Sequence, residues 1–290
     1  MKIQDILQKR KLTVSFEIFP PKQDSGLESV IACTEELAVL EPDFISVTYG
    51  AGGGTSANTV KICSHLQKIG ITPLSHLTCL SSTQQEVHSI LNDLQKNKIE
   101  NVLALRGDRP QDPDFIPPGD YHYASDLITD IKKQGSFCIG GACYPEGHPE
   151  SRHKDQDLEN LKRKVDSGCS FLTTQMFFDN NMLYSFLYRA QAQGIHIPVI
   201  AGIMPVTNGK QLKRMVELSN AYLPPKFLTL VDRFGDNNEA MKQAGIAYAT
   251  EQIIDLITNG VRGIHIYAMN KSDVIHNIIS NISEILKDAR

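Results

Sequence analysis

Short apolar runs rich in β-branched residues alternate with amphipathic runs along the whole chain. The apolar runs predict strands over residues 13–19, 43–49, 72–79, 101–107, 137–144, 171–178, 198–204 and 262–269. Between them, apolar residues recur at helical spacing, which predicts helices over 26–40, 56–69, 83–97, 124–134, 154–167, 180–193 and 208–219. A last helix is expected over 271–288. The chain is therefore a series of strand–helix pairs.

Local signals at the helix ends agree with this pattern. Thr83-Gln-Gln-Glu86 matches a capping box, in which each terminal residue binds the backbone of the other. Glycines follow four of the helical runs, where a left-handed residue commonly ends a helix: Gly70, Gly135, Gly168 and Gly194. Adjacent strand runs are not joined by the Asn-Gly or Asp-Gly pair typical of a hairpin. The strands are therefore expected to be parallel.

Eight strand–helix pairs in 290 residues favour an α/β fold of the (β/α)8 TIM-barrel type, with residues 1–290 as one catalytic domain. Residues 1–12 predict a short amphipathic helix that closes one end. The stretch 220–260 predicts an insertion of two helices, 221–233 and 237–259, before the eighth strand. A doubly wound open sheet is the alternative, but its G-x-G-x-x-G motif is absent after the first strand.

Composition narrows the class of protein. The net charge is −4 and no cluster of lysine and arginine suggests a nucleic-acid partner. No apolar run approaches the ~18 residues that a membrane span requires, and the N-terminus lacks the apolar stretch of a signal peptide. The six cysteines form no C-x-x-C pair, so reduced thiols and a cytoplasmic location are expected.

Glu17 lies in the middle of the apolar strand VSFEIF. Burying a polar group there costs roughly 2 to 7 kcal/mol unless something compensates. In a barrel the chemistry lies at the carboxyl ends of the strands. Most of those ends carry polar or ionisable residues: Glu17, Thr48, Tyr49, His76, Arg106, Asp108, Tyr144, Gln175, Tyr267 and Asn270. Their convergence predicts one polar pocket.

Each of these residues also has a structural interpretation. Glu17 could pair with a lysine at the rim, Arg106 could form an ion pair with Asp108, and His76 could be a satisfied core histidine. His76 and Cys79 lack the further ligands that zinc needs, so no metal is expected. The absence of G-x-S-x-G argues against a serine hydrolase.

Two segments favour an anionic ligand. The long loop 109–122 opens a helix whose first backbone N–H groups suit a phosphate. Lys162, Arg163 and Lys164 either form a solvated helix face or a cationic wall for a phosphate-bearing cofactor.

Nine motifs occur in order along the chain: F-E-I-F-P-P-K, V-T-Y-G-A-G-G, H-L-T-C, L-R-G-D-x-P, Y-A-S-D-L-I, Y-P-E-G-H-P-E, L-K-R-K-V-D-S-G, T-Q-M-F-F-D and G-I-M-P-V-T-N. Together, over residues 10–289, the chain resembles the methylenetetrahydrofolate reductase family in its single-domain bacterial form. The resemblance implies reduction of 5,10-methylenetetrahydrofolate to 5-methyltetrahydrofolate, with FAD as cofactor and NADH or NADPH as reductant. Such a product feeds one-carbon metabolism and methionine synthesis.

The resemblance also implies roles for individual residues. Glu17 is the expected general acid, and Asp108 is expected near the flavin and the pterin. Gln175 would meet folate and nicotinamide in turn, and Gln211 would help to hold folate. The implied FAD contacts are Thr48, Tyr49, Ala51, His76, Arg106, Gly107, Asp108, Tyr123, Ala124, Tyr144, His148, Asp157, Asn160, Arg163 and Lys164.

Three positions depart from the family pattern. Met215 replaces a phenylalanine that packs on the substrates. Lys271 replaces an arginine for the glutamate tail of folate, and lysine cannot form the bidentate fork with a carboxylate. Ser151 replaces an alanine of the FAD loop. Met215 and Lys271 are still expected at the substrate.

The residues suggest a mechanism. Opening the imidazolidine ring requires a proton at N10, and burial among Phe16, Ile18 and Phe19 is expected to raise the pKa of Glu17 toward neutrality. Asp108, staying ionised, would favour the iminium cation that follows. One flavin face serving both substrates in turn predicts ping-pong kinetics.

Three alternatives stay open. A barrel aldolase or hydrolase would be colourless and independent of folate. A flavin- or folate-binding barrel subunit would act only within a larger complex. A flavin-free relative is the third, against which the set of FAD-contact residues argues. The choice between NADH and NADPH is open, small-molecule substrates are the expected partners, and a homo-oligomer is expected.

Overall fold

Eight parallel strands form a closed barrel in the computed structural model, which describes residues 1–21, 23–49, 56–109, 112, 114–219 and 221–290. In chain order they are β1 (Thr13–Ile18), β2 (Phe44–Val47), β3 (Pro73–Thr78), β4 (Asn101–Leu105), β5 (Cys138–Cys143), β6 (Phe171–Thr174), β7 (Val199–Ile203) and β8 (Gly263–Tyr267). Each strand pairs with the next, and β8 closes the ring on β1, with Thr13 opposite Gly263. The predicted barrel is confirmed.

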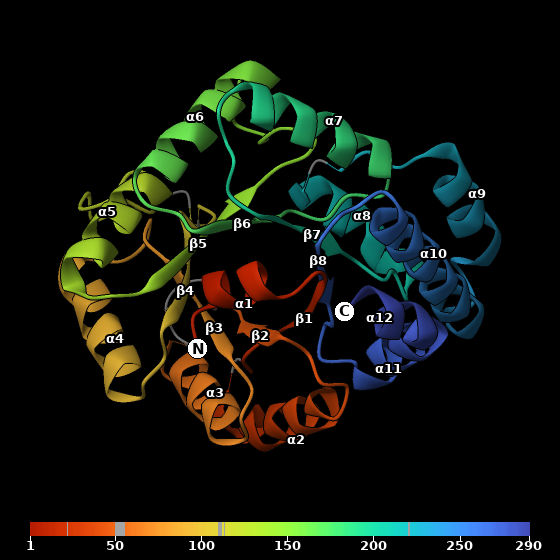
Figure 1. Cartoon of the computed structure of the whole chain (residues 1–290), viewed down its shortest axis with the longest axis horizontal. Helices are drawn as coiled ribbons and strands as arrows, with labels where there is room; N and C mark the ends of the chain where they lie inside the picture. Colours follow the sequence, from red (N-terminus) through yellow and green to blue (C-terminus); the bar gives the residue numbers. More distant parts are fainter. Residues whose placement is uncertain (22, 50–55, 110–111, 113, 220) are drawn as a thin grey trace.

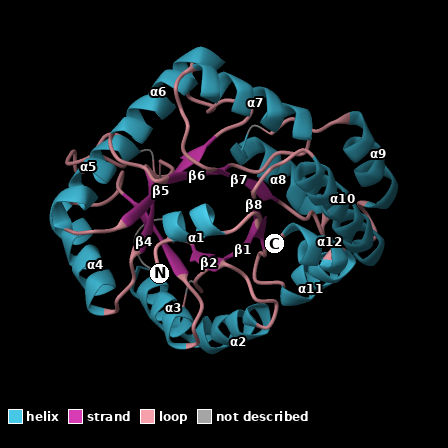
Figure 2. Cartoon of the chain, in the orientation of Figure 1, coloured by secondary structure: helices cyan, strands magenta, loops and turns pink. Residues whose placement is uncertain are grey.

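Helices surround the strand ring (Figure 1, Figure 2). Those that follow a strand are α2 (Leu27–Ala38, after the short 3-10 turn Asp24–Gly26), α3 (Ser56–Lys68), α4 (Gln84–Lys96), α5 (Ala124–Gln134), α6 (Lys154–Asp166), α7 (Asn180–Ala192), α8 (Gly209–Ser219) and α11 (Ser272–Asn281). The insertion before β8 is confirmed as α9 (Pro225–Phe234) and α10 (Asn238–Thr258).

Several predicted boundaries were wrong. The predicted strand 171–178 ends at Thr174, and Met176 to Phe178 form a buried loop that packs against other elements. The helix predicted from 221 begins at Pro225, since proline suits the first helical turn. The helix predicted over 271–288 is two helices, because Ile282 leaves the helical conformation and α12 (Ser283–Ala289) follows.

The predicted helix ends are mostly confirmed. The backbone N–H of Glu86 donates to Thr83 Oγ1 (3.3 Å) and that of Thr83 donates to Glu86 Oε2 (2.7 Å), which makes the capping box. Gly70, Gly168 and Gly194 are left-handed, with φ of 86°, 128° and 73°. Gly135 is extended (φ 169°), so that prediction was wrong.

The helix α1 (Ile3–Lys9) closes the amino-terminal end of the barrel and lies across the centre of the ring in Figure 1. Its Ile3 and Leu7 join the bottom layer of the barrel interior, which also contains Phe44, Leu74, Leu103, Cys138, Phe171 and Ile200. Asn101 fixes the segment: its Oδ1 accepts from the Ile3 N–H (2.8 Å), and its Nδ2 donates to the Met1 carbonyl (3.0 Å). With this end closed, ligands enter from the other end.

Candidate active site

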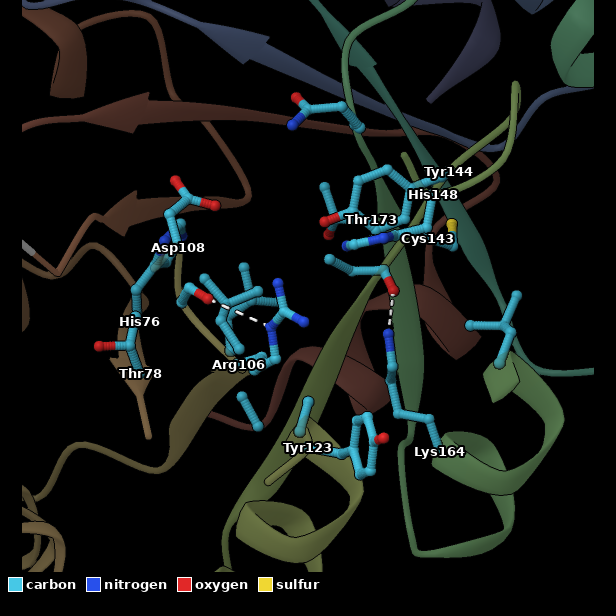
Figure 3. Close-up of a pocket in the computed structure, with 18 of the residues that line it drawn as sticks. His76, Thr78, Arg106, Asp108, Tyr123, Cys143, Tyr144, His148, Lys164 and Thr173 are labelled. Atoms are coloured by element: carbon cyan, nitrogen blue, oxygen red, sulfur yellow. Dashed lines mark hydrogen bonds between the residues drawn. The ribbon is translucent and has the colours of Figure 1, made fainter. Parts of the chain in front are cut away.

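A cavity of about 770 Å³ opens at the carboxyl ends of the strands. Ends of β1, β3, β4, β5, β6 and β8 contribute to its wall, together with loop residues, the first turn of α5 and residues along the length of α6. Figure 3 shows side chains from different strands, such as His76 of β3 and Thr173 of β6, lining this one space. Its size is in the range of small-molecule sites.

The structure brings most of the predicted site residues together. Those that line the cavity are Glu17, Thr48, Tyr49, His76, Arg106, Gly107, Asp108, Tyr123, Ala124, Tyr144, His148, Asp157, Asn160, Arg163, Lys164 and Gln175, and Ser151 lies with them. The convergence into one pocket predicted from the strand ends is therefore confirmed except for Asn270, whose side chain instead bonds to the Phe19 backbone N–H (2.8 Å) and carbonyl (2.9 Å). The contacts of these residues with a cofactor or substrate stay predictions.

Four residues predicted to contact the cofactor or the substrate are not placed in the cavity wall. Ala51 and the side chain of Gln211 lie outside the described residues. Met215 packs at the edge of a separate apolar cluster that contains residues of α9 and α10. Lys271 is exposed and donates from Nζ to Thr207 Oγ1 (2.7 Å). Neither Met215 nor Lys271 is among the described residues that line the cavity.

Glu17 lies on the inner face of β1 and is 7% exposed. Because successive side chains of a strand point to opposite faces, Phe16 and Ile18 instead belong to the layer between strands and helices. The neighbours of the Glu17 carboxylate are polar: its Oε2 lies 3.3 Å from Ser46 Oγ, 3.4 Å from His76 Nε2 and 3.5 Å from His265 Nε2. These groups compensate the burial of the carboxylate, so the rim lysine considered above is not needed.

The predicted rise in the pKa of Glu17 was wrong. Burial acts to raise the pKa of Glu17, but the hydrogen bond and charge of His265, the charge of His76 and the Ser46 hydroxyl outweigh it, so the pKa lies below its ordinary value. Burial itself lowers the pKa of His76 to about 4, although Glu17 acts in the opposite direction. His76 is therefore neutral at pH 7. Its Nε2 is buried and finds no hydrogen-bond partner among the described residues.

His265 is the functional candidate that the sequence analysis missed. It is 1% exposed in the middle of β8, and its Nδ1 lies 2.7 Å from Ser15 Oγ while its Nε2 lies 3.3 Å from Ser46 Oγ. These contacts hold the ring beneath Glu17. A signal did exist: Ser15, Ser46 and His265 each occupy an inward position in the two-residue alternation of their strand, where an apolar core would require apolar residues.

The opposite side of the cavity is cationic. The guanidinium of Arg106 forms two hydrogen bonds of 2.5 Å to the Glu150 carboxylate, and Nε donates to the Gly107 carbonyl (3.3 Å). In the described residues Arg106 therefore pairs with Glu150, and the ion pair with Asp108 considered above was wrong. Hydrogen bonding to Glu150 raises the pKa of Arg106, so the cation is permanent.

Lys162, Arg163 and Lys164 of α6 do not all lie on one side of the helix: some face the cavity and one faces solvent. Lys164 turns inward and donates from Nζ to the Ala142 carbonyl (2.6 Å), as Figure 3 shows. Burial lowers its pKa. Arg163 also lines the cavity, whereas Lys162 pairs with Asp166 on the same helix. The cationic wall therefore consists of Arg163 and Lys164, and Lys162 belongs to the solvated face.

The remaining ionisable groups of the cavity are tuned by burial. It raises the pKa of Tyr144 to about 12, so the phenol is neutral and can donate a hydrogen bond. It also raises the pKa of Asp157, which accepts a hydrogen bond from Ser151 Oγ (3.2 Å), and lowers the pKa of His148.

Among the described residues no group of three or more His, Cys, Asp or Glu side chains could hold a metal ion. None of the helices in the described part of the chain is long and apolar enough to cross a membrane.

Comparisons with known proteins identify the family. The family model "Methylenetetrahydrofolate reductase" matches residues 2–283. The chain is 36% identical over 272 residues to the 5,10-methylenetetrahydrofolate reductase of Escherichia coli (strain K12), covering 92% of this chain and 90% of that protein. It is 34% identical over 298 residues to "Methylenetetrahydrofolate reductase (NADH) 1" of Arabidopsis thaliana, covering 98% of this chain and 50% of that one.

A solved structure supports the fold. An uncharacterized protein from Clostridium thermocellum, described as binding two copies of 5-methyl-5,6,7,8-tetrahydrofolic acid, aligns with a TM-score of 0.66. The two chains are 16% identical, and the alignment covers 98% of this chain and 99% of that one.

Proposed function

Because the chain belongs to the methylenetetrahydrofolate reductase family and is thus an oxidoreductase, we propose that it uses FAD and NADH or NADPH to reduce 5,10-methylenetetrahydrofolate to 5-methyltetrahydrofolate. One observation carries the proposal. Side chains assigned by motifs scattered over the chain line a single cavity, and a buried carboxyl group, Glu17, lies in its wall. The product would feed one-carbon metabolism and methionine synthesis.

The residues of the cavity fit an FAD molecule. Arg106, Arg163 and Lys164 supply positive charge for a pyrophosphate, and the first turn of α5, at Tyr123 and Ala124, lines the same wall. The buried Nε2 of His76 lies 3.4 Å from Glu17 Oε2 but forms no hydrogen bond among the described residues, so it is suited to a polar group of a ligand. When bound, FAD would carry reducing equivalents from the nicotinamide to the folate.

We propose that Glu17 delivers the proton to N10 of the folate. Its pKa lies below the ordinary value, because neighbouring groups outweigh burial. A folate that covers the open side of Glu17 would exclude water and strengthen burial, which is already the largest influence on this pKa. Binding of the substrate itself would therefore move Glu17 toward the protonated form that an acid needs.

Asp108 and Gln175 have complementary tasks in this proposal. Asp108 is exposed at the end of β4, and its carboxylate would favour the iminium cation that forms on the substrate once the ring opens. Gln175 follows β6 and carries both a donor and an acceptor, which suits two different ligands that use one site in turn. Shared use of the site predicts ping-pong kinetics.

The visible spectrum of the purified protein tests the cofactor and both half-reactions. Under anaerobic conditions NADH and NADPH are added separately to the FAD-loaded protein, and methylenetetrahydrofolate is added afterwards. The expected result is a yellow protein that one nucleotide bleaches and the folate recolours. NADH is the first reductant to try, since it stands in the name of the Arabidopsis relative. A colourless protein that does not bind FAD would contradict the proposal, and binding without bleaching would favour the partner-dependent subunit.

Glu17→Gln separates the two half-reactions. Glutamine keeps the size of the side chain but cannot supply the proton, so bleaching by the nucleotide should persist while recolouring by folate slows by at least about 100-fold. Glu159→Gln is the matched control, because Glu159 is exposed on α6 and carries the same charge. Near-normal recolouring of the Glu17→Gln protein would contradict the role of Glu17 as the acid.

A further inference from the structure

Glu150 holds the cation that the cofactor is expected to use. Both oxygens of its carboxylate accept from the two terminal nitrogens of Arg106, each at 2.5 Å. This bidentate arrangement is the one in which arginine binds carboxylate or phosphate groups most strongly. Arg106 lies at the end of β4 and Glu150 in the loop between β5 and α6, so the pair bridges two segments of the cavity wall.

The Glu150 carboxylate can leave without disturbing the loop. The backbone of this segment is held separately: the Glu150 N–H donates to His148 Nδ1 (3.1 Å) and the Ser151 N–H donates to the His148 carbonyl (3.0 Å). The Glu150 side chain is 62% exposed, against 23% for Arg106. Among the described contacts, its carboxylate bonds only to Arg106. Rotation of this side chain therefore breaks one ion pair.

The charges of the cavity make this contact significant. Its lining carries the carboxyl groups of Glu17, Asp108, Glu150 and Asp157, together with three basic side chains, Arg106, Arg163 and Lys164. A pyrophosphate-bearing ligand adds more negative charge to this set. Since two anions that share one guanidinium repel each other, a phosphate gains the full attraction of Arg106 only after Glu150 has moved away.

We propose that Glu150 is an internal counter-anion that occupies Arg106 in the empty site and is displaced by a phosphate group of the bound flavin. Glu150 then lowers the affinity of the site for FAD and speeds the release of FAD, while it keeps Arg106 paired whenever the cofactor is absent. This inference rests on the proposed use of FAD. It assigns to Glu150 a role that neither the strand-end pattern nor the motif comparison assigned.

The test is FAD binding to the flavin-free full-length protein, followed by flavin fluorescence. Glu150→Gln keeps the shape of the side chain and removes its charge. An exposed ion pair of good geometry contributes up to about 1 kcal/mol, so the Kd for FAD should fall about 2- to 5-fold and the dissociation rate should fall with it. Riboflavin, which has no phosphate, should bind the variant and the wild type equally.

Controls separate displacement from other effects. Glu159→Gln, the exposed charge change on α6, should leave the Kd unchanged, and Glu150→Ala should tighten binding as Glu150→Gln does. In an Arg106→Gln background the Glu150 substitution should have no effect, because the cation that both anions share is gone. These results together would support the proposal.

Other outcomes overturn it. An unchanged or higher Kd in Glu150→Gln would show that Glu150 does not compete with the cofactor or that it positions Arg106 for it. If the Kd for riboflavin fell as much as the Kd for FAD in Glu150→Gln, Glu150 would not be competing with the phosphate groups for Arg106. If the wild-type protein binds no FAD, both the proposed use of FAD and the role of Glu150 are refuted. Tight wild-type binding without a gain in the variant refutes only the role of Glu150.

Discussion

The position of His265 beneath Glu17 leads to a prediction about the acid. His265→Leu removes the group that does most to lower the pKa of Glu17, while burial, which raises it, stays in place. The His265 Nε2 lies 3.5 Å from the carboxylate. A hydrogen bond to a charged group contributes about 1.5–3 kcal/mol, and one pKa unit corresponds to 1.36 kcal/mol. Removing this interaction should therefore raise the pKa of Glu17.

The pH profile of kcat/KM for folate reduction is the assay, since it reports the essential groups of the free enzyme. Glu17 must be protonated to act, so activity is lost as pH rises through its pKa. In His265→Leu this loss should move to higher pH, because the group that does most to lower the pKa of Glu17 is gone. Leucine can pack on the Phe44 ring, whose centroid lies 5.9 Å from that of His265. Ser46→Ala, which removes one weaker contact, should produce a smaller shift in the same direction.

Two controls accompany this experiment. His276→Gln, an exposed change on α11, should leave the profile where it is. Thermal unfolding and flavin content should show that each variant is folded and loaded. If a folded, loaded His265→Leu protein kept the wild-type profile, or lost activity at lower pH, the account of the Glu17 environment would be refuted.

Three further predictions concern stability. Burial lowers the pKa of His76 to about 4, against an ordinary value near 6.5, so the unfolded state takes up a proton at a higher pH than the folded state does. The free energy of unfolding should therefore decrease as the pH falls from about 6.5 to 4. Urea titrations at several pH values measure this decrease, and His76→Gln should remove up to about 3 kcal/mol of it. Gly245→Ala would place a Cβ 1.9 Å from the Val206 carbonyl oxygen and push α10 away from the loop after β7. The free energy of unfolding, measured in urea, should fall by at least about 1–3 kcal/mol, and an unchanged value would contradict this packing. Asn101→Ala removes the hydrogen bonds that hold the Ile3 N–H and the Met1 carbonyl, and should lower the free energy of unfolding by about 2–3 kcal/mol. Proteolysis at the N-terminus should become faster, and an unchanged rate would contradict the role of Asn101 in fixing α1.

The barrel was predictable from the sequence because its strands are buried on both faces, so each is a short apolar run with a helix behind it. The same reasoning failed at residues 176–178, where buried Phe177 and Phe178 extend the apolar run beyond the end of β6 at Thr174. Their burial comes from packing outside the sheet: the Tyr248 hydroxyl of α10 donates to the Phe178 carbonyl (2.6 Å). Apolar character shows that a residue is buried but does not show which element covers it.

The sequence predicted which residues line the cavity better than it predicted the charges and pKa values of those residues. The rule that chemistry lies at strand ends placed Glu17, Arg106 and Gln175 in one cavity. It could not identify the neighbour that determines the pKa of Glu17, because His265 is far away in sequence and meets Glu17 only through the pairing of β1 with β8. The same holds for Glu150, which reaches Arg106 from another loop.

The pairing of β1 with β8 also links activity to chain synthesis. Glu17 leaves the ribosome early, and the strand that carries its partner His265 follows about two hundred and fifty residues later, with Glu17 opposite Tyr267 in the register. Contacts between residues so distant in sequence form late and slowly. A nascent or C-terminally truncated chain thus has the acid without the histidine that holds it ionised, and the complete site exists only after the last strand has joined the first. During refolding, the return of activity therefore marks the moment at which the ring closes.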